Sequence, residues 1–242
     1  MIGDEMEYIL TKKIKNPIII QGFPSFGLVG TIATGFLIDH LNAEPIGEIV
    51  SKDIPPMLAV HNSQIIRPLE LYYDKKNNIL ILNALMNVAG KEWELSEVIL
   101  KMAKELSAKE IIVIEGVASP DLTQEEPGAY LYTTKKMDSM KACGIKKLDE
   151  GVILGVTASV LAKAKDTDVS CIFTETHSDL PDNLAAAKAI EVIDKYLGLK
   201  VDFKELIRKS KELQQKLQGI VQKGKQARAL TDEKQKELDY MG

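Results

Sequence analysis

The sequence predicts an α/β fold in which a mostly parallel or mixed sheet is covered by helices on both faces. Short apolar, β-branched runs alternate along the chain with longer segments of helical periodicity. The most apolar runs have no polar face, which is typical of strands buried on both sides. With 242 residues and 45% apolar content, the chain is long enough to bury a substantial core. A disordered protein is therefore excluded.

The expected elements follow the apolar runs in chain order. Strands are predicted at Pro17–Gln21, Ile46–Val50, Ile65–Tyr72, Ile79–Asn83, Glu110–Glu115, Gly151–Leu154 and Val169–Thr174. Helices are predicted at Leu28–Leu41, Glu92–Leu106, Thr157–Lys165 and Asp182–Leu197. Because several strands between Glu44 and Asn83 have no helix between them, we expect an antiparallel portion or a partly closed barrel there. Ser119–Thr134, rich in Pro, Gly and acidic residues, is expected to be a surface loop.

The composition changes near residue 200, so we expect an α/β domain at 1–200 and a helical tail at 201–242 with a mobile end. An apolar stripe in the tail has the three-and-four spacing of a coiled-coil seam, with Ser210 as its one polar member. The stripe favours an oligomer that brings tail helices together, or equally a helix that packs on its own domain. Its apolar members are Phe203, Leu206, Leu213, Leu217 and Ile220.

Composition also limits the function. The formal charge of −4 does not favour nucleic-acid binding. The spacing of Cys143 and Cys171 fits neither a metal site nor a redox pair. We interpret both as buried side chains of a protein that lies in a reducing compartment. An acidic N-terminus and the lack of a long apolar run predict a cytoplasmic protein with no membrane partner. Trp93, the single tryptophan, is interpreted as a core anchor.

The segment Gly22–Gly30 joins a strand to a helix and contains Gly22, Phe23, Pro24, Gly27 and Gly30. Its first two glycines have the spacing of a phosphate-binding loop, but Leu28 and Val29 replace the lysine and the hydroxyl residue that contact phosphate and magnesium. We interpret it as a tight turn, stiffened by Pro24. A phosphate site that uses only the free amides of the helix is the alternative.

Glu175–Asp182 directly follows another strand and contains Glu175, His177 and Asp182. Asp182 is a good N-cap for the following helix, so a structural role is favoured. A catalytic role is the alternative, although His177 has no nucleophile, second histidine or metal-ligand spacing beside it. Glu115, Gly116 and Ser119 at a third strand end could line the same crevice. No catalytic residue, metal or cofactor is predicted.

Three motifs together resemble the proteasome assembly chaperone two family over roughly residues 15–200: the Gly22–Gly30 turn, Gly155-Val156-Thr157 at a helix start, and Glu175-Thr176-His177 with Pro181-Asp182 and Ala186. The resemblance implies an archaeal-type homologue with a nucleoside phosphorylase-like α/β fold, no catalytic activity and self-association. It also implies that C-terminal segments engage proteasome α-subunits.

One departure from the family concerns the C-terminus. Binding tails of this kind end in a hydrophobic residue, a tyrosine and one last residue, whereas here Tyr240 is third from the end. A displaced tail would bind through Leu238, Tyr240, Met241 and Gly242. The sequence therefore predicts a non-enzymatic, homo-oligomeric proteasome assembly chaperone or proteasome-binding factor. The alternative is a small-molecule-binding protein or enzyme that uses the crevice at Gly22–Gly30 and Glu175–Asp182.

Overall fold

The computed structural model describes residues 5–54, 57–61, 63–119, 126–135, 143–176, 180–204 and 206–208. The chain divides into two units, residues 1–203 and residues 204–242, and the features below belong to the first unit. The domain boundary expected after residue 200 stays a prediction. None of the helices in the described ranges has the length and apolar character needed to cross a membrane.

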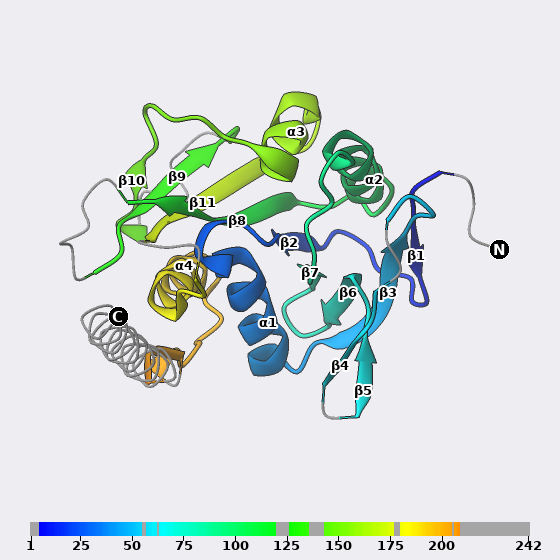
Figure 1. Ribbon diagram of the computed structural model, residues 1–242, viewed down its shortest axis with the longest axis horizontal. Helices are drawn as coiled ribbons and strands as arrows, with labels where there is room; N and C mark the ends of the chain where they lie inside the picture. Colours follow the sequence, from blue (N-terminus) through cyan, green and yellow to red (C-terminus); the bar gives the residue numbers. More distant parts are fainter. Residues whose placement is uncertain are drawn as a thin grey trace, which may run out of the picture. The chain divides into compact units, whose positions relative to one another are not determined.

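A nine-stranded open sheet forms the centre of the first unit, in the order β1-β3-β6-β7-β2-β8-β11-β9-β10 (Figure 1). The strands of this sheet are β1 (Glu7–Leu10), β2 (Ile18–Gly22), β3 (Glu44–Val50), β6 (Leu69–Asp74), β7 (Ile79–Ala84), β8 (Glu110–Ala118), β9 (Ala129–Thr133), β10 (Lys146–Lys147) and β11 (Val169–Thr176). A separate hairpin is made by β4 (Ala59–His61) and β5 (Gln64–Ile66).

The sheet contains both parallel and antiparallel strand pairs, and the type of each pair fits the connection between its strands. β7, β2, β8 and β11 are parallel neighbours, whereas β1, β3, β6 and β7 pair antiparallel in turn. The described residues between β3 and β7 form no helix, and antiparallel strands can be joined without one. The predicted antiparallel portion is therefore confirmed, within an open sheet.

Helices cover both faces of the sheet, as predicted (Figure 1). The helices α1 (Val29–Leu41) and α4 (Asn183–Leu197) pack together on one face, and α2 (Glu92–Glu105) and α3 (Gly155–Lys163) pack together on the other. Every residue of β7 and β11 is buried. Strands in such a position are largely apolar on both sides, which explains the apolar runs in the sequence.

The cores on the two faces use alternate residues of the same strands. Ile19, Val113 and Phe173 pack against Ile99 of α2 and Val160 of α3. Because successive strand residues point to opposite faces, their neighbours Ile20, Ile112 and Ile172 face α1 and α4. Both cysteines are free and buried, as the sequence suggested.

Four local expectations were wrong. Gly151–Leu154 is not a strand, and Val152 is 86% exposed, because this short apolar run has no neighbouring strand to pair with. The Ile65–Tyr72 run is split between β5 and β6 around Pro68, which has no backbone N–H for a ladder. The expected Ser119–Thr134 loop contains β9, which pairs with β11. Trp93 is 55% exposed on α2, with the Lys163 ammonium 5.0 Å from its ring centroid.

Candidate functional site

The three candidate segments meet at one edge of the sheet. β2, β8 and β11 are parallel and adjacent, with Gly22 opposite Ile114 and Gly116 opposite Thr174. Their carboxyl ends therefore lie side by side, which is where open α/β sheets place ligands. The structure thus brings together the turn 22–30, the end of β8, the end of β11 and Asp182.

The turn between β2 and α1 is packed against backbone at its glycines. A Cβ atom on Gly22 would lie 2.2 Å from the Gly30 carbonyl oxygen, and one on Gly116 would lie 2.0 Å from the Phe26 carbonyl oxygen. Gly27 has φ +63°, and a Cβ there would lie 2.7 Å from Thr176 Oγ1. Side chains are excluded at these positions by the chain's own atoms. The glycines therefore allow the turn to pack closely on β8 and β11.

Asp182 fastens this turn to α4. Its backbone N–H donates to the Gly27 carbonyl at a distance of 2.8 Å, and its Oδ2 accepts from the Thr176 hydroxyl, also at 2.8 Å. Its Oδ1 accepts from the N–H groups of Leu184 and Ala185, each at a distance of 3.0 Å. These bonds satisfy free donors at the start of α4, so Asp182 is the predicted N-cap. His177 lies outside the described residues.

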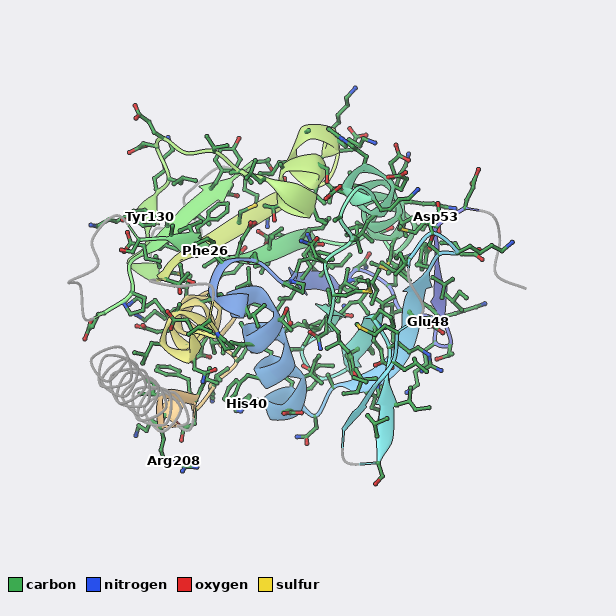
Figure 2. The ribbon with its side chains drawn as sticks, viewed as in Figure 1. Phe26, His40, Glu48, Asp53, Tyr130 and Arg208 are labelled. Atoms are coloured by element: carbon green, nitrogen blue, oxygen red, sulfur yellow. The ribbon has the colours of Figure 1, made fainter. Side chains whose placement is uncertain are left out.

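Glu175 is buried and holds the segment that leads into β9. One of its carboxylate oxygens accepts from the Gly128 N–H and the other from the Tyr130 hydroxyl, each at a distance of 3.0 Å. The hydrogen bond to Glu175 raises the pKa of Tyr130. Phe26 and Tyr130 come from the two segments that flank the end of β11 (Figure 2). The hydrogen bonds of Glu175 stabilise the strand end.

Glu115 lies on the opposite face of β8 from the packed Gly116. It hydrogen-bonds with Thr157 of α3, whereas Gly116 faces Phe26 and Val29. Burial raises the pKa of Glu115 to about 7, because the charged carboxylate is poorly solvated, although the Thr157 hydrogen bond opposes this shift. Its Oε2 has no hydrogen-bond partner among the described residues. Glu115 therefore does not line a common crevice with the turn 22–30.

Gln21 is a buried polar residue that the sequence-based interpretation missed. It is fully buried, and neither its Oε1 nor its Nε2 has a partner in the described part of the chain. It shares the α2 and α3 face with Ile19 and, by strand alternation, with Val113 and Glu115. The one polar side chain inside the apolar run Ile18–Gly22 was the available signal.

Among the described residues at the strand ends, Glu115 has a carboxyl group whose raised pKa of about 7 suits proton exchange near neutral pH. Within the described ranges, no group of three or more His, Cys, Asp or Glu side chains could hold a metal ion. Burial raises the pKa of the Cys171 thiol well above its usual range, which disfavours the nucleophilic thiolate. The described residues at the strand ends fit a rigid scaffold.

Exposed apolar side chains provide a second kind of candidate surface. Val60 and Ile65 are a cross-strand pair of the β4–β5 hairpin and are 74% and 57% exposed. Leu58, two residues before Val60, is 61% exposed. At the strand ends, Phe26 and Leu180 are 40% and 55% exposed. Grouped apolar side chains in water are typical of protein-binding surfaces. The sequence-based interpretation missed the hairpin, because its short strands have no strong periodicity.

The expected binding tail and most of the expected seam fall outside the part of the chain that the structure describes. Leu238, Tyr240, Met241 and Gly242 lie outside the described residues, as do Leu213, Leu217 and Ile220. Phe203 is the last residue of the first unit and Leu206 belongs to the second. The seam and the docking residues stay predictions.

Known structures share this fold over nearly the whole chain. PbaA of Pyrococcus furiosus, described as an archaeal homolog of proteasome-assembly chaperone, superimposes with a TM-score of 0.83 and 27% identity, covering 94% of this chain and 97% of PbaA. PbaB of the same organism, described as an archaeal proteasome activator, gives a TM-score of 0.77 and 23% identity over 90% of this chain and 99% of PbaB. The predicted fold class is confirmed.

Sequence comparison leads to the same group. An uncharacterized protein of Methanocaldococcus jannaschii is 26% identical over 223 residues, which are 90% of this chain and 92% of the relative. PbaA and PbaB are described as a chaperone homolog and a proteasome activator, in agreement with the prediction of a non-enzymatic protein. The sequence model of the PAC2 family matches residues 19–221. The chain belongs to the PAC2 family.

Proposed function

We propose that the protein binds the proteasome core particle as a homo-oligomer and assists its assembly or activation. The observation that carries this proposal is the similarity to PbaA, which extends over 94% of the chain at 27% identity. Similarity of fold alone is a weak guide to function, but membership of the PAC2 family gives the proposal additional support. The proposed contact is made by C-terminal tails, through Leu238, Tyr240, Met241 and Gly242, with proteasome α-subunits.

Two features of the first unit support a protein partner over a small ligand. The strand-end turn packs against backbone at Gly22 and Gly116, which supports a structural role for these glycines over a role in binding a ligand. The β4–β5 hairpin exposes Leu58, Val60 and Ile65 to solvent, which is unfavourable unless another surface covers them. The alternative, a small molecule in the crevice, stays a prediction that thermal-shift screening with nucleosides and phosphate tests.

The direct test is binding of purified proteasome α-rings and core particles to three versions of the protein. These are the full chain, a version without Tyr240–Gly242, and a version whose last five residues are replaced by an equally long Gly-Ser sequence. We expect the full chain to bind and both altered versions to bind at least tenfold more weakly. The reason is that Tyr240, Met241 and Gly242, which are proposed to dock on the α-subunits, are missing from both. Equal binding by all three would refute tail docking, and lack of binding by the full chain would refute the proposed function.

A further inference from the structure

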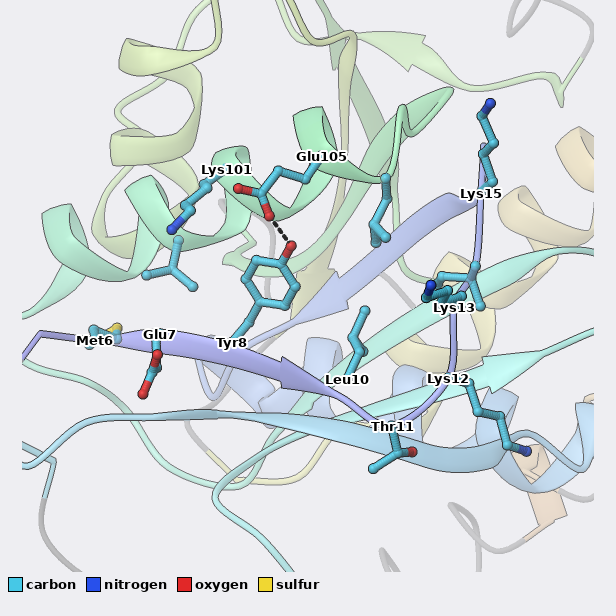
Figure 3. Close-up of a pocket in the computed structure, with 13 residues that line it drawn as sticks. Met6, Glu7, Tyr8, Leu10, Thr11, Lys12, Lys13, Lys15, Lys101 and Glu105 are labelled. Carbon is cyan, nitrogen blue, oxygen red and sulfur yellow. Dashed lines mark hydrogen bonds between the residues drawn. The ribbon is translucent and has the colours of Figure 1, made fainter. Parts of the chain in front are cut away.

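A groove lies between the edge strand β1 and the helix α2. Its cavity volume is about 810 Å³, and its walls come from β1, the following residues 11–15 and α2. Figure 3 shows Tyr8 and Leu10 pointing from β1 toward α2, where the Tyr8 hydroxyl donates to Glu105. Val98 of α2 and Ile14 add apolar lining. The groove therefore has an apolar floor beside an open strand.

The outer edge of β1 presents unpaired backbone groups. β1 is the last strand of the sheet order, and among the described residues only β3 pairs with it. The Thr11 N–H donates to the Ile46 carbonyl at a distance of 2.7 Å. Because hydrogen-bonded and non-hydrogen-bonded residue pairs alternate along an antiparallel ladder, this bond shows which residues of β1 bond to β3. Glu7 and Ile9 then bond to β3, whereas the N–H and C=O groups of Tyr8 and Leu10 point away from it. These groups form a short template for a further strand.

Lysines dominate the rim of this groove. Lys12, Lys13, Lys15 and Lys101 line it together with only two acidic residues, Glu7 and Glu105 (Figure 3). Lys12 pairs with Glu44, whereas Lys13, Lys15 and Lys101 make no ion pair with any described residue. This excess is local, since the whole chain has a formal charge of −4. The groove therefore favours a negatively charged partner.

We propose that the β1–α2 groove binds an extended acidic peptide segment, which adds to β1 as a tenth strand. A peptide backbone supplies both the donors and the acceptors that Tyr8 and Leu10 require, at the regular spacing of a strand, whereas the phosphates of a nucleic-acid backbone supply only acceptors. Acidic side chains of the peptide pair with Lys13, Lys15 and Lys101. The proposed site uses no residue of the C-terminal tail, and its test does not depend on proteasome binding.

The first experiment measures the anisotropy of a fluorescein-labelled eight-residue peptide, in which glutamate alternates with threonine, as the full-length protein is added. We expect Lys13→Glu with Lys101→Glu to weaken binding at least tenfold. The matched control, Lys146→Glu with Lys147→Glu, reverses two exposed lysines of β10, the strand at the other end of the sheet, and binding should stay within twofold of the original. Thermal unfolding of each variant verifies that it is folded.

The second experiment separates strand addition from general attraction between charges. Methylating two successive central nitrogens of the peptide blocks both of its edges without changing its charge, and we expect at least a tenfold loss of affinity. In the complex with the original peptide, hydrogen exchange at the Tyr8 and Leu10 amides should slow. Equal binding by the methylated peptide, no effect of the Lys13 and Lys101 changes, or no peptide binding would each overturn the proposal. Equally tight binding of a single-stranded oligonucleotide would overturn it in favour of a nucleic-acid site.

Discussion

Glu115 shows how one buried residue makes stability depend on pH. In the unfolded chain its pKa is near the ordinary value of 4.5, whereas in the folded protein burial raises this pKa to about 7. Between these two values the folded state holds more protons than the unfolded state. The contribution of Glu115 to the free energy of unfolding therefore falls as pH rises from about 4.5 to about 7.

Glu115→Gln removes this dependence, because glutamine has nearly the same shape and no charge. We expect the free energy of unfolding of the variant, relative to the original protein, to rise by roughly 1–3 kcal/mol between pH 4.5 and pH 7.5. Urea unfolding at a series of pH values measures the difference. The control is Glu150→Gln at an exposed position, which should show no comparable trend. A flat difference for Glu115→Gln would mean that its carboxyl group is better solvated than the fold indicates.

At the scale of elements, the contact between the turn 22–30 and the strand ends depends on glycines for two different reasons. Gly27 has a positive φ, which side chains other than glycine adopt at a cost. Gly116 needs no unusual angle, but the Phe26 carbonyl occupies the place of its Cβ. Gly35 in α1 has neither constraint, since apart from its chain neighbours and the backbone of its own helix no atom lies within 4 Å of its Cβ position.

Two Gly→Ala substitutions test this distinction. Gly116→Ala should lower the free energy of unfolding by at least about 2 kcal/mol, because either β8 or the turn must move. Gly35→Ala should raise it by about 0.5–1 kcal/mol, because alanine favours the helix and meets no obstacle. Chemical denaturation of both variants gives the two values. Similar effects at both positions would show that packing against Phe26 does not constrain the turn.

The elements that the sequence predicted are those whose signal is local. The apolar runs of β2, β7, β8 and β11 and the periodicity of the four helices give their positions to within a few residues. β1 and β9 were missed because each depends on a partner strand distant in the chain. Gly151–Leu154 was wrongly predicted for the converse reason: an apolar run without a neighbouring strand stays outside the sheet.

The candidate site was predictable in its location but not in its contacts. Parallel strands end at one edge of a sheet, so the meeting of Gly22, Gly116 and Thr176 follows from their positions after strands. The sequence could not indicate that Gly116 packs on Phe26 or that Glu115 faces α3, because these contacts depend on the packing of distant elements. Gln21 escaped notice because a single polar residue hardly alters an apolar run.

At the scale of the whole molecule, the proposed function requires that self-association and docking reside in different parts of the tail. The predicted seam contains Leu213 and Leu217, whereas the predicted docking residues begin at Leu238. Several linked tails bind a ring of repeated pockets more tightly than one tail does, because each later contact is intramolecular. Loss of the oligomer should therefore weaken binding even when every docking residue is present.

Leu213→Glu with Leu217→Glu in the full chain tests this separation. Light scattering should show a smaller assembly, and affinity for proteasome α-rings should fall by roughly 10²–10⁴-fold, the usual size of a multivalent gain. The version without Tyr240–Gly242 is the matched comparison, since it should keep the original mass and still lose binding. If the double variant keeps its mass, then the stripe packs on its own domain. If it becomes smaller yet binds with unchanged affinity, then one tail is sufficient and multivalency has no part in the mechanism.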